Sequence, residues 1–185
     1  MESAAKIKEI LQAASIEKLP EFIAEYETDP RSGVQKLVAS ARKKLDALEK
    51  EKQRIEKLKK YEREYAQYSY ICGIDEVGRG PLAGPVVAGA VILPKDCHIL
   101  YINDSKQLSE KKREELYDVI TREAVAWAVG YASPKRIDEI NILQATYEAM
   151  REAIGKLTPA PELLLNDAVM IPGVNIRQVP IIKGD

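Results

Sequence analysis

Residues 70–93 of this chain read YICGIDEVGRGPLAGPVVAGAVIL, and this stretch decides the fold. Its first six residues are mostly apolar and predict a strand that ends at the acids Asp75 and Glu76. Residues 85–93 are almost all apolar, which is typical of a strand buried on both faces. The glycines and prolines between the two runs predict a tight connection.

Helical and strand-like patterns alternate after this stretch and predict an α/β domain. Ser109 is a good N-cap for a helix that ends at Glu123. Ser133 is a second N-cap, followed by proline, for a helix that reaches about residue 157 and breaks near Ile140. Three more strands are expected, at residues 125–132, 162–166 and 178–182.

The first 66 residues have a different character, because Lys, Glu, Ala and Leu dominate and strand-like runs are missing. Asp29-Pro30 predicts a break between helices, and a long helix is expected from Ser32 to about Tyr65. One narrow stripe along it is typical of an antiparallel helix pair or a short coiled coil. The stripe consists of Val34, Val38, Ala41, Leu45, Leu48 and Ile55.

Composition excludes several classes of protein. The chain has 185 residues, of which 45% are hydrophobic and 31% are charged, and this argues against a disordered protein. No apolar run is long enough for a membrane helix, and the N-terminus lacks the apolar core of a signal peptide. Cys72 and Cys97 cannot form a disulfide framework, so the sequence predicts a cytoplasmic protein.

Charge gives two interpretations of the long helix. The net charge is −1, so only a local patch could attract nucleic acid. Between Arg31 and Arg63 there are 12 basic and 5 acidic residues. This excess fits either contacts to phosphate or a solvated helix face with salt bridges.

Four carboxylates lie at predicted strand ends, where ligands bind in open α/β sheets. They are Asp75, Glu76, Asp167 and Asp185. Because side chains alternate along a strand, Asp75 and Glu76 can converge only if the strand ends at Asp75 and the chain turns. Convergent carboxylates without histidine or thiolate suit Mg²⁺ or Mn²⁺. The alternative is four solvated loop or cap residues.

The loop after Glu76 allows two interpretations. Residues 78–83 satisfy the G-x-G-x-x-A form of the dinucleotide fingerprint, and glycines let main-chain amides approach phosphate. That fingerprint needs a helix to begin within it, whereas a strand is expected from Pro85. The alternative is a tight hairpin connection.

Some other residues have candidate roles. Lys106 follows Asn103-Asp104-Ser105 beside the Ser109 cap and is a candidate phosphate contact, as is Lys183 beside Asp185. His98, the only histidine, lies in a polar connection, which argues against triad and zinc chemistry. Trp127 alternates with two valines and is expected in the core.

Residues 73–87, GIDEVGRGPLAGPVV, closely resemble bacterial ribonuclease HII, the type 2 ribonuclease H family. Residues 103–109 (NDSKQLS) and 182–185 (IKGD) agree in order and spacing. The resemblance covers residues 70–185, and residues 1–66 resemble the N-terminal helical extension of some bacterial members. It implies an α/β, ribonuclease H-like mixed sheet flanked by helices and preceded by an all-α extension.

The resemblance also implies an activity. The family cleaves the RNA strand of RNA–DNA hybrids and nicks DNA at embedded ribonucleotides, using Mn²⁺ or Mg²⁺. When the family's catalytic metal ligands are carried over to this sequence, they fall on the four strand-end acids named above. Backbone groups of Gly78, Arg79 and Gly80 would sense the ribose 2′-hydroxyl, and Lys106 would contact phosphate. No membrane and no obligate protein partner is implied.

The chain stops on Asp185, whereas family members continue for some tens of residues. The catalytic domain is therefore expected to lack its C-terminal part. The alternative function is an impaired chain that binds hybrid duplex without cutting it.

Overall fold

The computed structural model describes residues 2–80, 83–167 and 169–181. The chain forms two compact units, one up to Leu58 and one from Lys59 onward. The expected boundary of the extension at residue 66 stays a prediction. Each unit has its own buried cluster of apolar side chains.

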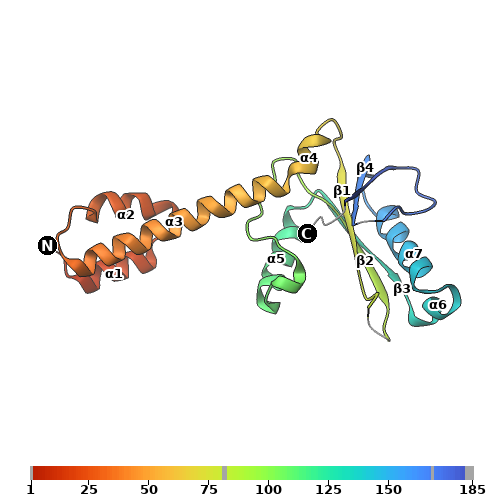
Figure 1. Ribbon diagram of the computed structural model, residues 1–185, viewed down its shortest axis with the longest axis horizontal. Coiled ribbons are helices and arrows are strands. Elements are labelled where there is room, and N and C mark those ends of the chain that lie inside the picture. The colour runs from red at the N-terminus through yellow and green to blue at the C-terminus, as the bar shows by residue number, and fades with distance from the viewer. Residues whose placement is uncertain (1, 81–82, 168, 182–185) are drawn as a thin grey trace. The chain divides into compact units, whose positions relative to one another are not determined.

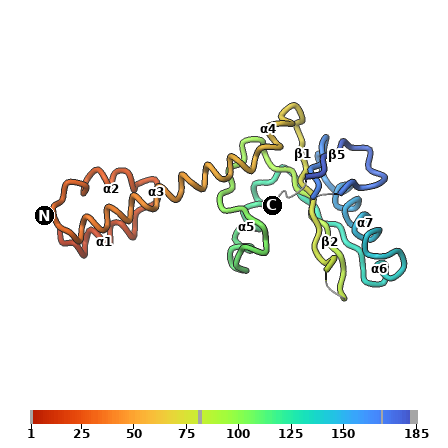
Figure 2. The backbone as a smooth tube through the Cα atoms, viewed as in Figure 1, coloured from red at the N-terminus to blue at the C-terminus, as the bar shows by residue number. Residues whose placement is uncertain are grey.

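The helical unit is built on one long helix, along which two shorter helices pack (Figures 1 and 2). The elements are α1 (Ala4–Ala13), a 3₁₀ turn (Ile16–Lys18), α2 (Leu19–Tyr26) and α3 (Ser32–Leu58). Large side chains of all three helices form its core: Ile7, Leu11, Leu19, Phe22, Tyr26, Val34, Val38 and Ala41. Val34, Val38 and Ala41 of the expected apolar stripe on α3 lie in this core, and Leu45 packs against it.

The long helix ends earlier than its sequence predicts. Lys59 leaves helical geometry with ψ 16°, and a separate short helix, α4 (Lys60–Glu64), follows. No glycine or proline marks this position, so the sequence carries no signal for the break.

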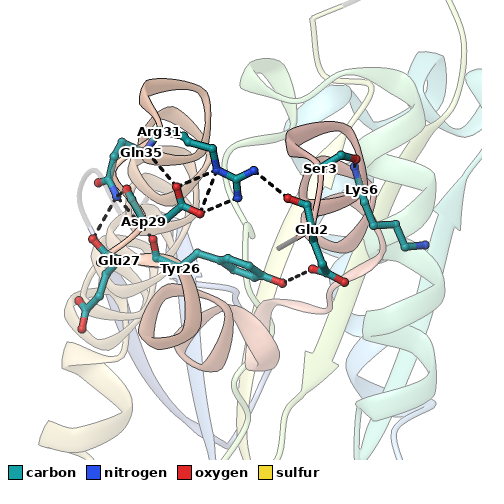
Figure 3. Close-up of polar contacts among 8 residues, drawn as sticks. All are labelled: Glu2, Ser3, Lys6, Tyr26, Glu27, Asp29, Arg31 and Gln35. Atoms are coloured by element: carbon teal, nitrogen blue, oxygen red, sulfur yellow. Dashed lines mark hydrogen bonds and ion pairs between the residues drawn. The ribbon is translucent and has the colours of Figure 1, made fainter.

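A polar network ties the start of the helical unit to the turn between α2 and α3 (Figure 3). The guanidinium of Arg31 donates to both carboxylate oxygens of Asp29, at 2.6–3.2 Å, and to the main-chain oxygen of Glu2 at 2.7 Å. The Tyr26 hydroxyl donates to the Glu2 carboxylate at 2.7 Å. The hydrogen bond from Arg31 lowers the pKa of Asp29 to about 2, and the bond to Glu2 raises the pKa of Tyr26.

The second unit contains a mixed five-stranded sheet in the order β3-β2-β1-β4-β5. Strands β1, β2 and β3 pair antiparallel, while β4 and β5 continue from β1 in parallel. The bounds are β1 (Ile71–Val77), β2 (Val86–Ile92), β3 (Ala126–Ala132), β4 (Leu163–Asp167) and β5 (Arg177–Ile181). All five strands overlap the predicted ranges, although β1 continues two residues beyond Asp75.

Two helices of this unit begin at the predicted caps. Ser109 accepts a hydrogen bond from the Lys112 amide, and Ser133 accepts one from the Arg136 amide. Asn141, with φ 69°, separates two helices and confirms the predicted break near Ile140. The helices are α5 (Glu110–Glu123), α6 (Pro134–Ile140) and α7 (Ile142–Gly155), and a 3₁₀ turn spans Ser105–Gln107.

Helix α7 packs against β2 and β3 through small residues (Figure 1). A Cβ atom at Gly130 of β3 would fall on the carbonyl oxygen of Ala149 and lie 2.8 Å from the Ala153 amide nitrogen. The other small buried residues of this core include Ala88, Ala90, Ala128, Ala132 and Ala145. The main chains of α7 and β3 are therefore too close for any larger side chain.

The prediction that Trp127 lies in the core is wrong. Ala128 and Ala132 of β3 are buried on the face covered by α7, so the alternating Trp127 lies on the opposite face. That face is only partly covered: Trp127 is 43% exposed and meets the Tyr117 ring of α5 at 6.2 Å.

The outer edge of β3 meets side chains of α7. The Glu152 carboxylate accepts from the Tyr131 amide at 3.0 Å, and the Lys156 ammonium donates to the Val129 carbonyl at 2.9 Å. The same two side chains form an ion pair at 2.6 Å. We call Glu152 and Lys156 the edge clasp.

Across the described residues, none of the helices has the length and apolar character that a membrane span requires.

Candidate metal centre

Two of the predicted carboxylates lie on adjacent parallel strands. Ile74 of β1 pairs with Asn166 of β4, so the next residues, Asp75 and Asp167, are neighbours on the opposite face. Both are exposed, whereas Ile74 and Asn166 are buried. Parallel strands place their carboxyl ends at one edge of a sheet, which explains why these two acids lie near each other. Their role as metal ligands stays a prediction.

Glu76 does not join them on that face. Strand β1 continues to Val77, so the condition for convergence, a turn at Glu76, is not met. Glu76 is half-buried, and its carboxylate forms an ion pair with Arg79 at 3.0 Å. This ion pair was not predicted from the sequence, although opposite charges three residues apart at a strand end indicate one.

The glycine loop is a hairpin connection, because β2 begins at Val86 and pairs antiparallel with β1. The dinucleotide interpretation, which needs a helix at this position, is therefore excluded. Gly78 has φ 100°, and a Cβ there would meet the Pro85 carbonyl oxygen, so this position requires glycine. At Gly80, by contrast, a Cβ would have no neighbour within 4 Å.

The loop that carries Lys106 is held by its own polar groups. The Asp104 carboxylate accepts from the Lys106 amide at 3.0 Å. Arg113 of α5 donates to the carbonyl oxygens of Ser105 and Leu108, at 3.3 and 2.8 Å. The Lys106 side chain is exposed. The bonds from Arg113 to this loop were not predicted from the sequence, because they depend on how α5 folds back on the loop before it.

Lys183 and Asp185, the remaining candidates, lie outside the described residues. The last described residue of β5, Ile181, pairs with Asp167.

The donor atoms at this edge fit a hard divalent cation. Carboxylate oxygens are the ligands that Mg²⁺ and Mn²⁺ prefer, and Asp75 and Asp167 supply them from adjacent strands. Within residues 2–80, 83–167 and 169–181, however, no three acids, histidines or cysteines are grouped closely enough to hold a metal. Of the four predicted ligands, Asp75 and Asp167 lie on adjacent strands, and their binding of a metal stays a prediction.

Thiol and imidazole chemistry find no support at this edge. Burial raises the pKa of the Cys72 thiol to about 12, so it stays protonated near neutral pH. His98 lies within hydrogen-bonding distance of Lys59, at 3.1 Å.

Comparison with known proteins decides the family. Residues 3–66 match the ribonuclease HII N-terminal domain, and residues 72–183 match the ribonuclease HII family itself. The chain belongs to the ribonuclease HII family. The second matched region contains the Asp75–Asp167 pair, the glycine loop and the Lys106 loop.

Curated ribonuclease HII proteins are similar over most of this chain. The protein from Lachnoclostridium phytofermentans is 66% identical over 160 residues, which are 86% of this chain and 63% of the relative. The protein from Clostridioides difficile is 50% identical over 99% of this chain and 72% of its own length. The chain thus spans between about three fifths and three quarters of these relatives.

A solved structure has the same fold. The ribonuclease H2 from Pyrococcus horikoshii aligns over 63% of this chain and 64% of its own, with a TM-score of 0.52 and 25% identity. The predicted ribonuclease H-like mixed sheet with flanking helices and an N-terminal helical region is therefore confirmed.

Proposed function

We propose that this chain carries the metal-binding core of an endonuclease that hydrolyses the RNA strand of RNA–DNA hybrids and nicks duplex DNA at embedded ribonucleotides. The observation that supports this most is the placement of Asp75 and Asp167 on neighbouring parallel strand ends. Membership of the ribonuclease HII family supports the same reaction class.

The proposed cofactor is Mn²⁺ or Mg²⁺, held by Asp75, Glu76, Asp167 and Asp185. When bound, two such cations would activate a water molecule and stabilise the leaving 3′-oxygen. Asp75 and Asp167 would hold cations from the sheet edge. Glu76 could join them by giving up its ion pair with Arg79.

Substrate recognition is proposed for the loops beside this edge. The main chain around Gly80, where even a Cβ would meet open space, can approach a ribose 2′-hydroxyl closely. Lys106 is exposed on a braced loop and would contact a backbone phosphate, as would Lys183. The proposal needs no protein partner.

The test is cleavage of a duplex that contains one ribonucleotide, with Mn²⁺ added after chelation. Asp75→Asn is expected to reduce cleavage by about a hundredfold or more, since mutating even the residues that only orient metal ligands typically costs about 10- to 100-fold. The fold should be retained or stabilised, because one charge fewer faces Asp167. The matched control is Asp118→Asn, an exposed acid on α5.

Three outcomes are informative. Mn²⁺-dependent cleavage that Asp75→Asn abolishes and Asp118→Asn preserves supports the proposal. Equal activity of Asp75→Asn and the parent contradicts the assigned site. Binding of the duplex without any cleavage by the parent favours the alternative, a chain that acts only as a hybrid-binding module.

A further inference from the structure

A pair of amide side chains lies behind the candidate metal edge, on the buried face of the sheet. Asn166 of β4 is 1% exposed, and its Nδ2 donates to Oε1 of Gln178 on β5 at 2.8 Å. Leu164 pairs with Gln178 in the parallel register, so Asn166 and Gln178 share one face. Asp167, the next residue after Asn166, lies on the other face.

Main-chain groups of the β4–β5 connection determine how both amides are oriented. Nδ2 of Asn166 donates to the carbonyl oxygen of Val169 at 3.1 Å. Gln178 accepts from the Ile171 amide at 2.8 Å and donates to the Ile171 carbonyl at 2.9 Å. A carbonyl can only accept and an amide N–H can only donate, so neither side chain can be flipped without losing these bonds.

These bonds hold the main chain close to Asp167. Asn166 precedes Asp167 in the strand, and its side chain reaches Val169 beyond it. Gln178 holds Ile171, which is 2% exposed and packs in the core of the unit. Val169 and Ile171 of the β4–β5 connection are thus bound by two side chains that lie on the face opposite Asp167.

Stability alone does not explain asparagine at this position. Oδ1 of Asn166 is buried and has no hydrogen-bond partner among the described residues. A buried acceptor without a donor costs free energy, which an apolar side chain would avoid. The hydrogen bonds of the Asn166 side chain all come from Nδ2, which donates to Val169 and Gln178.

We infer that Asn166 and Gln178 are positioning residues for Asp167. They bind Val169 and Ile171 after β4, so that the Asp167 carboxylate stays beside Asp75. The inference rests on the proposed function, since it assigns the pair to the same metal edge. Residues that orient metal ligands from outside the coordination sphere typically change metal affinity by about 10- to 100-fold when mutated.

The test measures Mn²⁺ binding by the chain without nucleic acid, from the electron paramagnetic resonance signal of free Mn²⁺. Asn166→Leu and Gln178→Met remove the amides at similar volume. The control Leu164→Val trims a fully buried residue on the same face of β4, with no bond to the connection. The Ile171 amide donates a hydrogen bond to Gln178, so its hydrogen-exchange rate reports how firmly the β4–β5 connection is held.

We expect both amide variants to bind Mn²⁺ about tenfold more weakly and to exchange faster at Ile171. Their cleavage rate at saturating Mn²⁺ should return close to that of the parent. Leu164→Val should lower the melting temperature without changing Mn²⁺ affinity. If Asn166→Leu fails to fold, Gln178→Met decides the question.

Unchanged Mn²⁺ affinity in the folded amide variants overturns the inference. If Asp75→Asn still abolishes Mn²⁺ binding in that case, the proposed function stands and only the positioning role falls. If the parent itself does not bind Mn²⁺, the proposed function and the positioning role are both contradicted.

Discussion

The two units of this protein build their cores in opposite ways. The helical unit uses large side chains such as Leu19 and Phe22 to fill the space between three helices. The second unit packs α7 against β3 through alanines and Gly130, where main-chain atoms nearly touch. Large side chains leave cavities when trimmed, whereas main-chain packing leaves no space for an added atom. The helical core and the contact between α7 and β3 should therefore fail under opposite kinds of substitution.

The largest effect is expected for Gly130→Val, because the added side chain would overlap the Ala149 carbonyl. We expect a loss of at least about 4 kcal/mol, the range of severe core disruption. Urea unfolding followed by fluorescence of Trp127, the only tryptophan, measures this unit. Gly89→Val on β2 is the control, since a Cβ there meets nothing within 4 Å. Similar midpoints for the two variants would refute close main-chain packing.

A smaller loss is expected for Leu19→Ala, which opens a cavity in the helical unit where Leu19 is 1% exposed. The loss should be about 2–5 kcal/mol. Far-ultraviolet circular dichroism should show an earlier helical transition, while the Trp127 fluorescence midpoint stays at the parental value. A parallel shift of both probes would mean that the two units unfold as one.

Acid should weaken the helical unit through Asp29. Arg31 lowers the pKa of Asp29 to about 2, below the ordinary value of about 3.9. The stabilisation is therefore complete above about pH 4 and is lost as the pH falls toward 2. Asp29→Asn should remove this part of the pH dependence. The measurement is the urea midpoint of the helical transition at pH values between 2 and 5. If the midpoints of parent and variant change with pH in parallel, the assigned role of Asp29 is contradicted.

The smallest effect on stability is expected for Lys43→Gln combined with Lys44→Gln, two exposed residues of α3. If the basic excess of this helix binds phosphate, the salt dependence of duplex binding should become shallower by about 0.9 for each phosphate that is no longer neutralised. Lys135→Gln on α6 serves as the control. An unchanged slope would favour the solvated helix face, the other interpretation of this charge.

The sequence is sufficient for elements whose signal is local. The strands follow from alternation of apolar residues, and the Ser109 and Ser133 caps follow from cap chemistry. Trp127 could not be placed, because its pattern does not tell which face of β3 receives a helix.

Contacts between distant segments were beyond the sequence for a similar reason. Gln178 meets Asn166 only through the register of two parallel strands, and Arg113 braces the Lys106 loop only through the direction of α5. Neither the register nor the direction is encoded in a short pattern. The role of Glu76 depended on how far β1 extends, which the sequence left open.

The edge clasp of β3 has a consequence for solubility. Strand β3 ends the sheet and exposes Trp127, Val129 and Tyr131, a composition that invites another chain to add a strand. Glu152 and Lys156 occupy the hydrogen-bonding positions that such a strand would need. The hydrogen bond from Lys156 keeps the pKa of Glu152 below its usual range, so the clasp holds at neutral pH and weakens in acid. In acid this edge is therefore less well protected against the addition of a strand from another chain.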